Sequence, residues 1–136
     1  MKSCEVTIEI PFHDVDAMGI VWHGHYAKYF EIARCALLES IDYNYHQMKA
    51  SGYSWPVVDM HVRYAKSATF RQKIVVVATL VEWENRLKVS YLIKDAADGR
   101  RLITGSTTQV AVHIEAGELC FESPAIVFQK LGLPVP

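Results

Sequence analysis

The first residues of the chain alternate between polar and apolar side chains. Between residues 5 and 10, polar side chains at odd positions alternate with apolar side chains at even positions, which predicts a strand with one face in solvent. Residues 11–19 break this alternation and carry several ionisable groups, which indicates a loop.

The apolar positions change to a helical period after the loop. Tyr26, Phe30, Ala33, Leu37 and Ile41 recur at spacings of three or four residues, which predicts a long helix. Further apolar residues widen this stripe. We therefore expect the helix to be in contact over most of its circumference rather than to lie on a surface.

A long region of β character follows a polar stretch at residues 42–54. Its apolar or alternating runs are residues 57–62, 74–81, 87–93 and 102–114. The turn-forming pairs Asn85-Arg86 and Asp98-Gly99 lie between successive runs, so the pattern predicts antiparallel strands joined by short turns. The run at 74–81 is nearly continuous and β-branched, which favours a strand that is buried on both faces.

The C-terminal region carries the signals of a short helix. Ser123 is the predicted N-cap, Pro124 the first helical residue, and Gly132 the residue that ends the helix. Together the elements predict an α+β architecture in which one long helix packs on a face of a curved antiparallel sheet. The remaining apolar face and the edges of the sheet would favour dimerisation.

Length and composition are those of one globular domain. The 136 residues contain no repeat and no linker, so we expect a single domain over residues 1–136. Hydrophobic residues make up 51% and charged residues 21%, which excludes a disordered chain. Fourteen basic and fifteen acidic residues give a net charge of -1, so no overall field attracts nucleic acid.

The sequence also lacks signals for membrane insertion and for metal binding by cysteine. No apolar run reaches the roughly 18 residues of a membrane span, and the N-terminus lacks the apolar core of a secretory signal. We therefore expect a cytoplasmic protein. Cys4, Cys35 and Cys120 form no Cys-x-x-Cys pair, so neither a zinc ribbon nor a disulfide framework is expected. Cys35 falls in mid-helix and is expected to be an inert hydrophobic residue.

Reactive side chains are densest just before the predicted helix. Asp14, Asp16, His23 and His25 lie here. The N-terminus of a helix offers unpaired N–H groups and the positive end of the helix dipole, which stabilise a developing negative charge. A carboxylate beside it could act as a general base or a nucleophile. The segment therefore suits attack on a carbonyl group whose oxygen becomes an oxyanion.

The same segment resembles a family signature. Residues 14–26 are similar to the motif of the 4-hydroxybenzoyl-CoA thioesterase family in the hotdog superfamily, with Asp-x-Asp-x-x-Gly, two aliphatic residues, and a Tyr ten residues after the second Asp. Residues 29–34 resemble the start of the family's central helix, and residues 57–68 its second strand. The resemblance implies a hotdog fold of about five antiparallel strands around one long helix. It also implies homodimers or homotetramers with active sites at the dimer interface.

The resemblance further implies a function. It implies an acyl-CoA thioesterase that releases a free acid and CoA, with no bound cofactor because CoA belongs to the substrate. Asp16 takes the place of the catalytic carboxylate, and the backbone N–H of His23 that of the oxyanion donor. Two positions depart from the family pattern: His25 stands where Asn or Ser is common, and Arg71-Gln72 stands where Gly-Asp is common.

Other residues are candidates to contact the acyl group or the CoA phosphates. They are Trp22, His25, Tyr26, Tyr64, Lys66 and Arg71. Trp55 could also line an acyl pocket, although a place in the core is the ordinary expectation for a large aromatic side chain. Aromatic side chains suit an acyl pocket, and cations suit phosphates. Asp14 is expected to be structural, orienting the loop through an Asx-type bond.

Several alternatives remain at this point. Asp16 could attack the carbonyl directly or activate water, and the thioester could belong to an acyl carrier protein. A dehydratase of the same fold would use a histidine base, here His23 or His25, with an acidic partner. A non-catalytic protein would bind acyl-CoA without turnover. A zinc site would join His23 and His25 to His13 or an aspartate, but His-x-His alone is a weak motif and no metal is expected.

Overall fold

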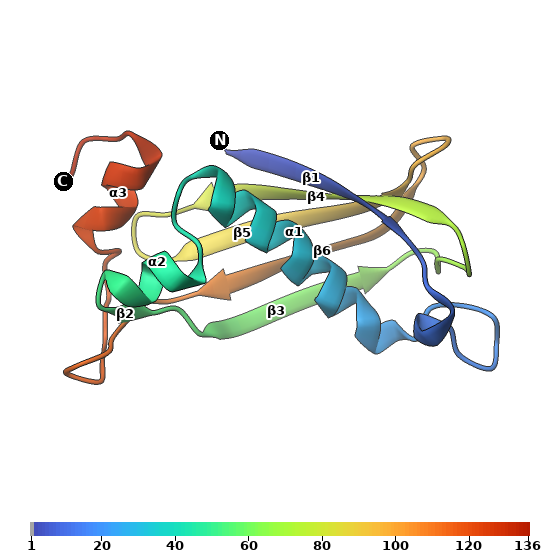
Figure 1. Cartoon of the computed structure of the whole chain (residues 1–136), viewed down its shortest axis with the longest axis horizontal. Helices are drawn as coiled ribbons and strands as arrows, with labels where there is room; N and C mark the ends of the chain where they lie inside the picture. The colour runs from blue at the N-terminus through green and yellow to red at the C-terminus, as the bar shows by residue number, and fades with distance from the viewer. Residues whose placement is uncertain (1) are drawn as a thin grey trace.

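Five strands form one antiparallel sheet in the computed structural model, which describes residues 2–136. They are β1 (Ser3–Glu9), β3 (Val57–Tyr64), β4 (Lys73–Glu82), β5 (Leu87–Asp95) and β6 (Arg101–Gln109). Their order across the sheet is β1-β4-β5-β6-β3, so β1 and β3 are its edges (Figure 1). The predicted meander is confirmed, because β4, β5 and β6 are neighbours joined by short turns.

One long helix, α1 (Tyr26–Ser40), lies across one face of this sheet (Figure 1). It packs over β1 and β4. Two short 3-10 helices precede it, η1 (Phe12–Asp14) and η2 (His23–His25). The predicted α+β architecture, with one helix on a sheet of five strands, is thereby confirmed.

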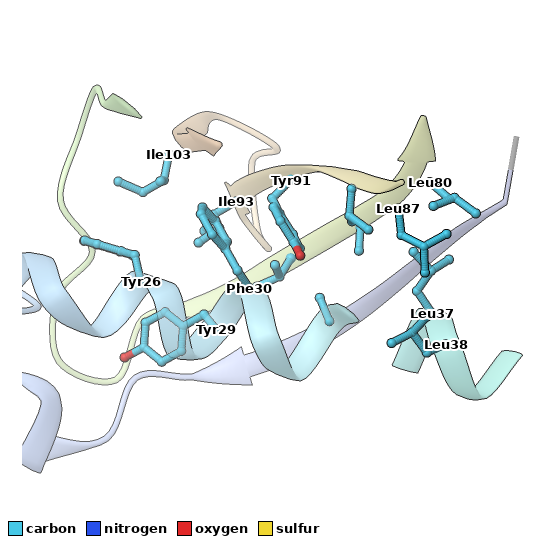
Figure 2. Close-up of a cluster of buried hydrophobic side chains, with 14 of the residues drawn as sticks. Tyr26, Tyr29, Phe30, Leu37, Leu38, Leu80, Leu87, Tyr91, Ile93 and Ile103 are labelled. Carbon is cyan, nitrogen blue, oxygen red and sulfur yellow. The ribbon is translucent and has the colours of Figure 1, made fainter. Parts of the chain in front are cut away.

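The core fills the space between α1 and the sheet (Figure 2). The rings of Phe30 on α1 and Tyr91 on β5 stack with centroids 4.3 Å apart. Gly105 on β6 makes this close packing possible, since a Cβ atom there would lie 2.6 Å from the Phe30 ring. Leu37 and Leu38 continue the buried face of α1 toward its C-terminus.

The helix is less enclosed than the sequence predicts. Its buried residues include Tyr26, Phe30 and Leu37, but Ile32 keeps 44% of its surface exposed. The expectation of contact over most of the circumference is therefore wrong for the single chain, because the sheet covers only one side of α1. Arg34 is buried on that covered side and donates hydrogen bonds to the hydroxyls of Tyr45 and Tyr91, at 2.9 and 3.3 Å.

Two of the predicted strand features need correction. Residues of β4 alternate between buried and half-buried, so the strand is not buried on both faces: α1 covers one face only. The predicted run at 102–114 is not one strand. β6 ends at Gln109, and the chain then forms β7 (Val112–His113), which pairs with β2 (Tyr53–Ser54) and β8 (Glu118–Leu119) in a small second sheet.

The remaining helices lie at the end of the molecule opposite the N-terminus of α1 (Figure 1). α2 (Tyr45–Ala50) lies in the polar stretch at residues 42–54, where the sequence pattern predicts no helix. A reciprocal capping box of Asn44 and Gln47 begins this helix. α3 (Ala125–Leu131) ends at Gly132 as predicted, with φ of 71°. Its N-cap is Pro124, so the prediction of Ser123 as N-cap is wrong by one residue and no side chain caps this helix.

Candidate active site

Residues 14–22 form a closed loop in front of α1. The Trp22 N–H donates to the Asp14 carbonyl at 3.0 Å, and the Asp16 N–H donates to the Ile20 carbonyl at 2.9 Å. Gly19 provides the turn with φ of 80°, a conformation that a side chain would strain. The backbone thus closes the segment that carries both aspartates of the motif, directly before η2 and α1.

Asp14 is the buried anchor of this loop. Its carboxylate is 1% exposed and accepts hydrogen bonds from Lys28 Nζ at 2.7 Å and from the Tyr29 hydroxyl at 2.6 Å. Burial alone would raise the pKa of the Asp14 carboxyl, but these two hydrogen bonds and the Lys28 charge hold that pKa below its usual value. Burial and the same contact raise the pKa of Tyr29, so its phenol remains a proton donor. Asp14 therefore ties the loop to the first turn of α1.

Asp16 has a different environment, although it lies only two residues away. Its side chain is half-buried, and its Oδ1 accepts the Met18 N–H at 2.8 Å. Among the described residues 2–136, this is the one hydrogen bond to the carboxylate, which leaves Oδ2 free. The Asx-type bond predicted for Asp14 is thus made by Asp16 instead, because the Asp14 carboxylate is engaged by α1.

His23 begins η2, which leads directly into α1. Its carbonyl accepts the Tyr64 hydroxyl at 3.2 Å. Within residues 2–136 no acceptor pairs with the His23 N–H, so this amide is available at the positive end of the helix dipole. The His23 N–H therefore stays a candidate oxyanion donor.

Aromatic rings surround the start of the helix. The Trp22 ring lies 5.1 Å from the His23 ring and 5.3 Å from the His25 ring, and the Tyr64 ring packs on His23 at 6.1 Å. Trp22 and Tyr64 are exposed, whereas Tyr26 is buried and its hydroxyl accepts the Ala68 N–H at 3.0 Å. The fold thus brings four of the predicted substrate-binding residues together, with Tyr26 beneath the other three.

The other predicted contacts lie in two different places. Lys66 and Arg71 are exposed on the loop between β3 and β4, and neither has a carboxylate within 4.0 Å among residues 2–136. One isolated β-bridge, between Ile20 and Thr69, joins this loop to the Asp16 loop. Trp55, by contrast, is buried at the other end of the sheet, where its Nε1 donates to the Tyr43 hydroxyl at 3.2 Å. Of the two roles left open for Trp55, the structure supports that of a core residue.

Lys28 and Tyr29, the partners of Asp14, are not among the site residues that the sequence predicts. Their spacing from the motif was a possible signal, because the first turn of α1 faces the loop that precedes it.

Cys35 is half-buried and burial raises the pKa of its thiol, in line with the expected inert role. No three His, Cys, Asp or Glu side chains within residues 2–136 are arranged to hold a metal ion.

Two cavities of the single chain have linings that do not include Asp16. One of about 620 Å³ opens on the sheet face opposite α1, and another of about 440 Å³ lies beside α2. His23 instead borders the N-terminal end of α1 beside the exposed rings of Trp22 and Tyr64, and Asp16 lies in the loop that precedes it. A substrate pocket at this position would need further walls.

The profile of the Thioesterase-like superfamily matches residues 10–130 of the chain. The chain belongs to this superfamily. Membership places it among thioester hydrolases and agrees with the resemblance of residues 14–26. No helix in the described part of the chain, residues 2–136, is long and apolar enough to cross a membrane.

Individual relatives point in the same direction. The candidate esterase sll0410 of Synechocystis is 29% identical over 96% of this chain and 79% of its own length. The candidate acyl-CoA thioesterase YneP of Bacillus subtilis is 34% identical over 67% of this chain and 65% of its own length. A DHNA-CoA thioesterase structure from Staphylococcus aureus is 28% identical, with a TM-score of 0.80 over 89% of this chain and 81% of that one. A hypothetical protein of Thermus thermophilus superposes with a TM-score of 0.84 at 27% identity over 95% of this chain and 97% of that one.

Proposed function

We propose that this protein is an acyl-CoA thioesterase with Asp16 as its catalytic carboxylate. The observation that supports the proposal is the closed loop of residues 14–22. It holds the half-buried Asp16 carboxylate, with one oxygen fixed by the Met18 N–H, and it leads directly into His23, whose N–H has no acceptor within residues 2–136. A base or nucleophile and an oxyanion donor are the two groups that thioester hydrolysis requires.

The chemistry needs no further acid. Asp16 accepts a proton from water as the water oxygen bonds to the thioester carbon, and the carbonyl oxygen becomes an oxyanion held by the His23 N–H. When the carbonyl re-forms, the carbon–sulfur bond breaks and the thiolate leaves. A thiol resembling that of cysteine has a pKa near 8.5, so the thiolate departs and takes up a proton from solvent. Asp16 releases its proton to solvent and is a carboxylate again. Direct attack by Asp16 would give an anhydride that water then opens, with the same products.

The charge distribution supports a CoA thioester as substrate. Residues 9–28, 63–73 and 94–101, at the end of the molecule that holds Asp16, carry eight basic and five acidic side chains (Figure 1). Residues 36–54, 81–89 and 110–136, at the other end, carry four basic and seven acidic side chains. Such an asymmetry draws a polyanion toward the basic end. Lys66 and Arg71 are the candidate cations beside the Asp16 loop, and an acyl carrier protein thioester is the nearest alternative substrate.

A homo-oligomer, a dimer or a tetramer, is part of the proposal. β3 is an edge strand, and its helix-side residues Met60 and Tyr64 keep 48% and 51% of their surfaces exposed. An exposed apolar strand at a sheet edge favours pairing with a second chain. Pairing through β3 would place a second copy beside Trp22 and Tyr64 and give the acyl group its missing walls.

A comparison of wild type with Asp16→Asn tests the function. Thiol release is measured from short-chain, long-chain and aryl acyl-CoA. We expect kcat to fall by about 10² to 10⁴ in the variant with all substrates that the wild type hydrolyses, because a positioned base contributes that much. Asp98→Asn, an exposed aspartate in the β5–β6 turn, is the matched control and should retain activity.

The same panel separates the alternatives. Similar thiol release by wild type and Asp16→Asn would refute the role of Asp16. If His23→Ala or His25→Ala removed activity on hydroxyacyl-CoA while Asp16→Asn did not, a dehydratase would replace the thioesterase. His25 lies near a carboxylate, with its Nε2 3.9 Å from Asp14 Oδ1. Binding of acyl-CoA with no turnover would indicate a non-catalytic protein.

A further inference from the structure

A cavity of about 620 Å³ opens on the sheet near the free edge strand, and no part of the proposed reaction uses it. The side chains that line it come from β3, β5 and β6. They include His61, Arg63, Ser90, Arg101, Thr104 and Ser106.

Strand alternation places this cavity on the face opposite α1. Tyr91 stacks on Phe30 of the helix, so its neighbour Ser90 points away from α1. Ser90 pairs with Ser106, and Ser106 pairs with His61, so these three side chains form one row across the three strands. Arg63 and Thr104 form the next row toward the catalytic end.

The lining is cationic and rich in hydroxyl groups. No carboxylate lines the cavity, and within residues 2–136 neither Arg63 nor Arg101 has a carboxylate within 4.0 Å. Asp59 lies in the neighbouring row, beside Thr108, and its carboxylate pairs with His61 at 3.1 Å. Guanidinium groups bind phosphate oxygens in bidentate geometry, and serine and threonine hydroxyls add further donors. Two unpaired guanidinium groups beside three hydroxyls are complementary to a ligand with more than one phosphate group.

The cavity is also close to the candidate active site. Arg63 immediately precedes Tyr64, and the Tyr64 hydroxyl donates to the His23 carbonyl on the helix side. One β-strand therefore carries a candidate phosphate ligand on one face and a contact to the oxyanion donor on the other. A flexible pantetheine arm joins the thioester of CoA to its phosphates, so the two groups can occupy different faces at this end of the sheet.

We infer that Arg63 and Arg101 bind the phosphorylated adenosine part of CoA on the sheet face opposite α1. The inference rests on the proposed function and goes beyond it. According to the inference, this cavity contributes to the affinity for the CoA substrate, in addition to Lys66 and Arg71. Free phosphate would share the chemistry, but it lacks the second phosphate group that a two-arginine site selects.

The double variant Arg63→Gln/Arg101→Gln tests the inference with two substrates that share one acyl group. One is an acyl-CoA, and the other is the N-acetylcysteamine thioester, which has no nucleotide. We expect KM for the acyl-CoA to rise about tenfold or more, as for the loss of hydrogen bonds to charged groups. KM for the N-acetylcysteamine thioester should stay within twofold of the wild-type value, and kcat should be unchanged for both substrates. Lys88→Gln is the matched control, because Lys88 lies on β5 outside the cavity.

Direct binding provides a second readout that does not require catalysis. By isothermal titration calorimetry, 3′,5′-ADP should bind the wild type more tightly than inorganic phosphate does, and the double variant should lose most of this affinity. These measurements remain informative if no thioester is hydrolysed, so failure of the proposed function can be distinguished from failure of this inference.

Three outcomes would overturn the inference. One is an unchanged KM for acyl-CoA in the double variant, particularly if Lys66→Gln/Arg71→Gln raises it. Another is an equal rise for both thioesters, which would indicate a general effect on the fold or the acyl site. The third is a molar mass of the double variant that differs from that of the wild type in multi-angle light scattering. Such a difference would show that a second copy of the chain covers this face.

Discussion

At the scale of single residues, the two aspartates of the motif differ in burial, and this difference separates their roles. Asp14 is enclosed and receives hydrogen bonds from Lys28 and Tyr29, whereas Asp16 is half-buried and receives one from a backbone amide. A carboxylate that is already saturated by donors cannot take a proton from water readily. The less engaged Asp16 is therefore the better candidate for catalysis, and Asp14 for holding the loop.

Asp14→Asn should lower the free energy of unfolding at neutral pH by about 1–3 kcal/mol, because a buried, charge-assisted hydrogen bond is lost. The pKa of Asp14 is lower in the folded chain than its ordinary value of 3.8. Its ionised form thus stabilises the fold above that value, and this stabilisation is lost as the pH falls through the folded pKa. Urea unfolding from pH 7 down to pH 3 should show the difference between variant and wild type shrinking at the acid end. A difference that is constant with pH would contradict this account, and Asp98→Asn serves as control.

At the scale of the elements, the contact of α1 with the sheet depends on one missing side chain. A Cβ atom on Gly105 would lie 2.5 Å from the His61 carbonyl oxygen and 2.6 Å from the Phe30 ring. Such distances require either β3 or the helix to move. The close spacing of β3, β6 and α1 therefore depends on glycine at this position.

Gly105→Ala should destabilise the protein by about 1–3 kcal/mol through overpacking, even though alanine suits a strand no less than glycine. Thermal or urea unfolding measures the change. Ser106→Ala, the next residue on the opposite face of β6, is the control and should stay within about 0.5 kcal/mol of wild type. Equal effects of the two substitutions would show that the Phe30 contact is not the cause.

At the scale of the whole molecule, the single chain leaves one apolar edge unpaired. The fold covers β1 and β4 with α1, but Met60 and Tyr64 on the helix side of β3 remain exposed. An exposed edge strand of this kind tends to associate. The proposed dimer would bury this strand and complete the acyl pocket in one step.

Met60→Lys should therefore separate the proposed dimer into monomers and abolish thiol release, because an uncompensated charge would be buried in the interface. Sedimentation velocity over a range of protein concentrations measures the first effect, and thiol release the second. Leu133→Lys, another exposed apolar position near the C-terminus, should change neither. A monomeric wild type with full activity would disprove the interface.

The sequence predicts this fold where local periodicity decides the structure. Helix α1 begins at Tyr26 as predicted, and the turns at Asn85-Arg86 and Asp98-Gly99 connect the predicted strands. The predictions fail where the partner of a segment matters. The run at 102–114 keeps its alternation through Val112, but its pairing changes from the main sheet to the small one. The alternation of polar and apolar side chains indicates which face of a strand is apolar. It does not indicate which strand lies beside it.

The sequence by itself determined the α+β architecture, the motif of residues 14–26 and the family, since these depend on local period and residue order. Only the tertiary structure decided that Asp14 is bonded to Lys28 and Tyr29, that Asp16 makes the Asx-type bond, and that Trp55 is a core residue. The same holds for the arginines opposite α1, which three strands bring to one cavity. The physical reason is that burial and hydrogen-bond partners arise from segments that are distant in the chain, and periodicity along the chain does not encode their positions in space.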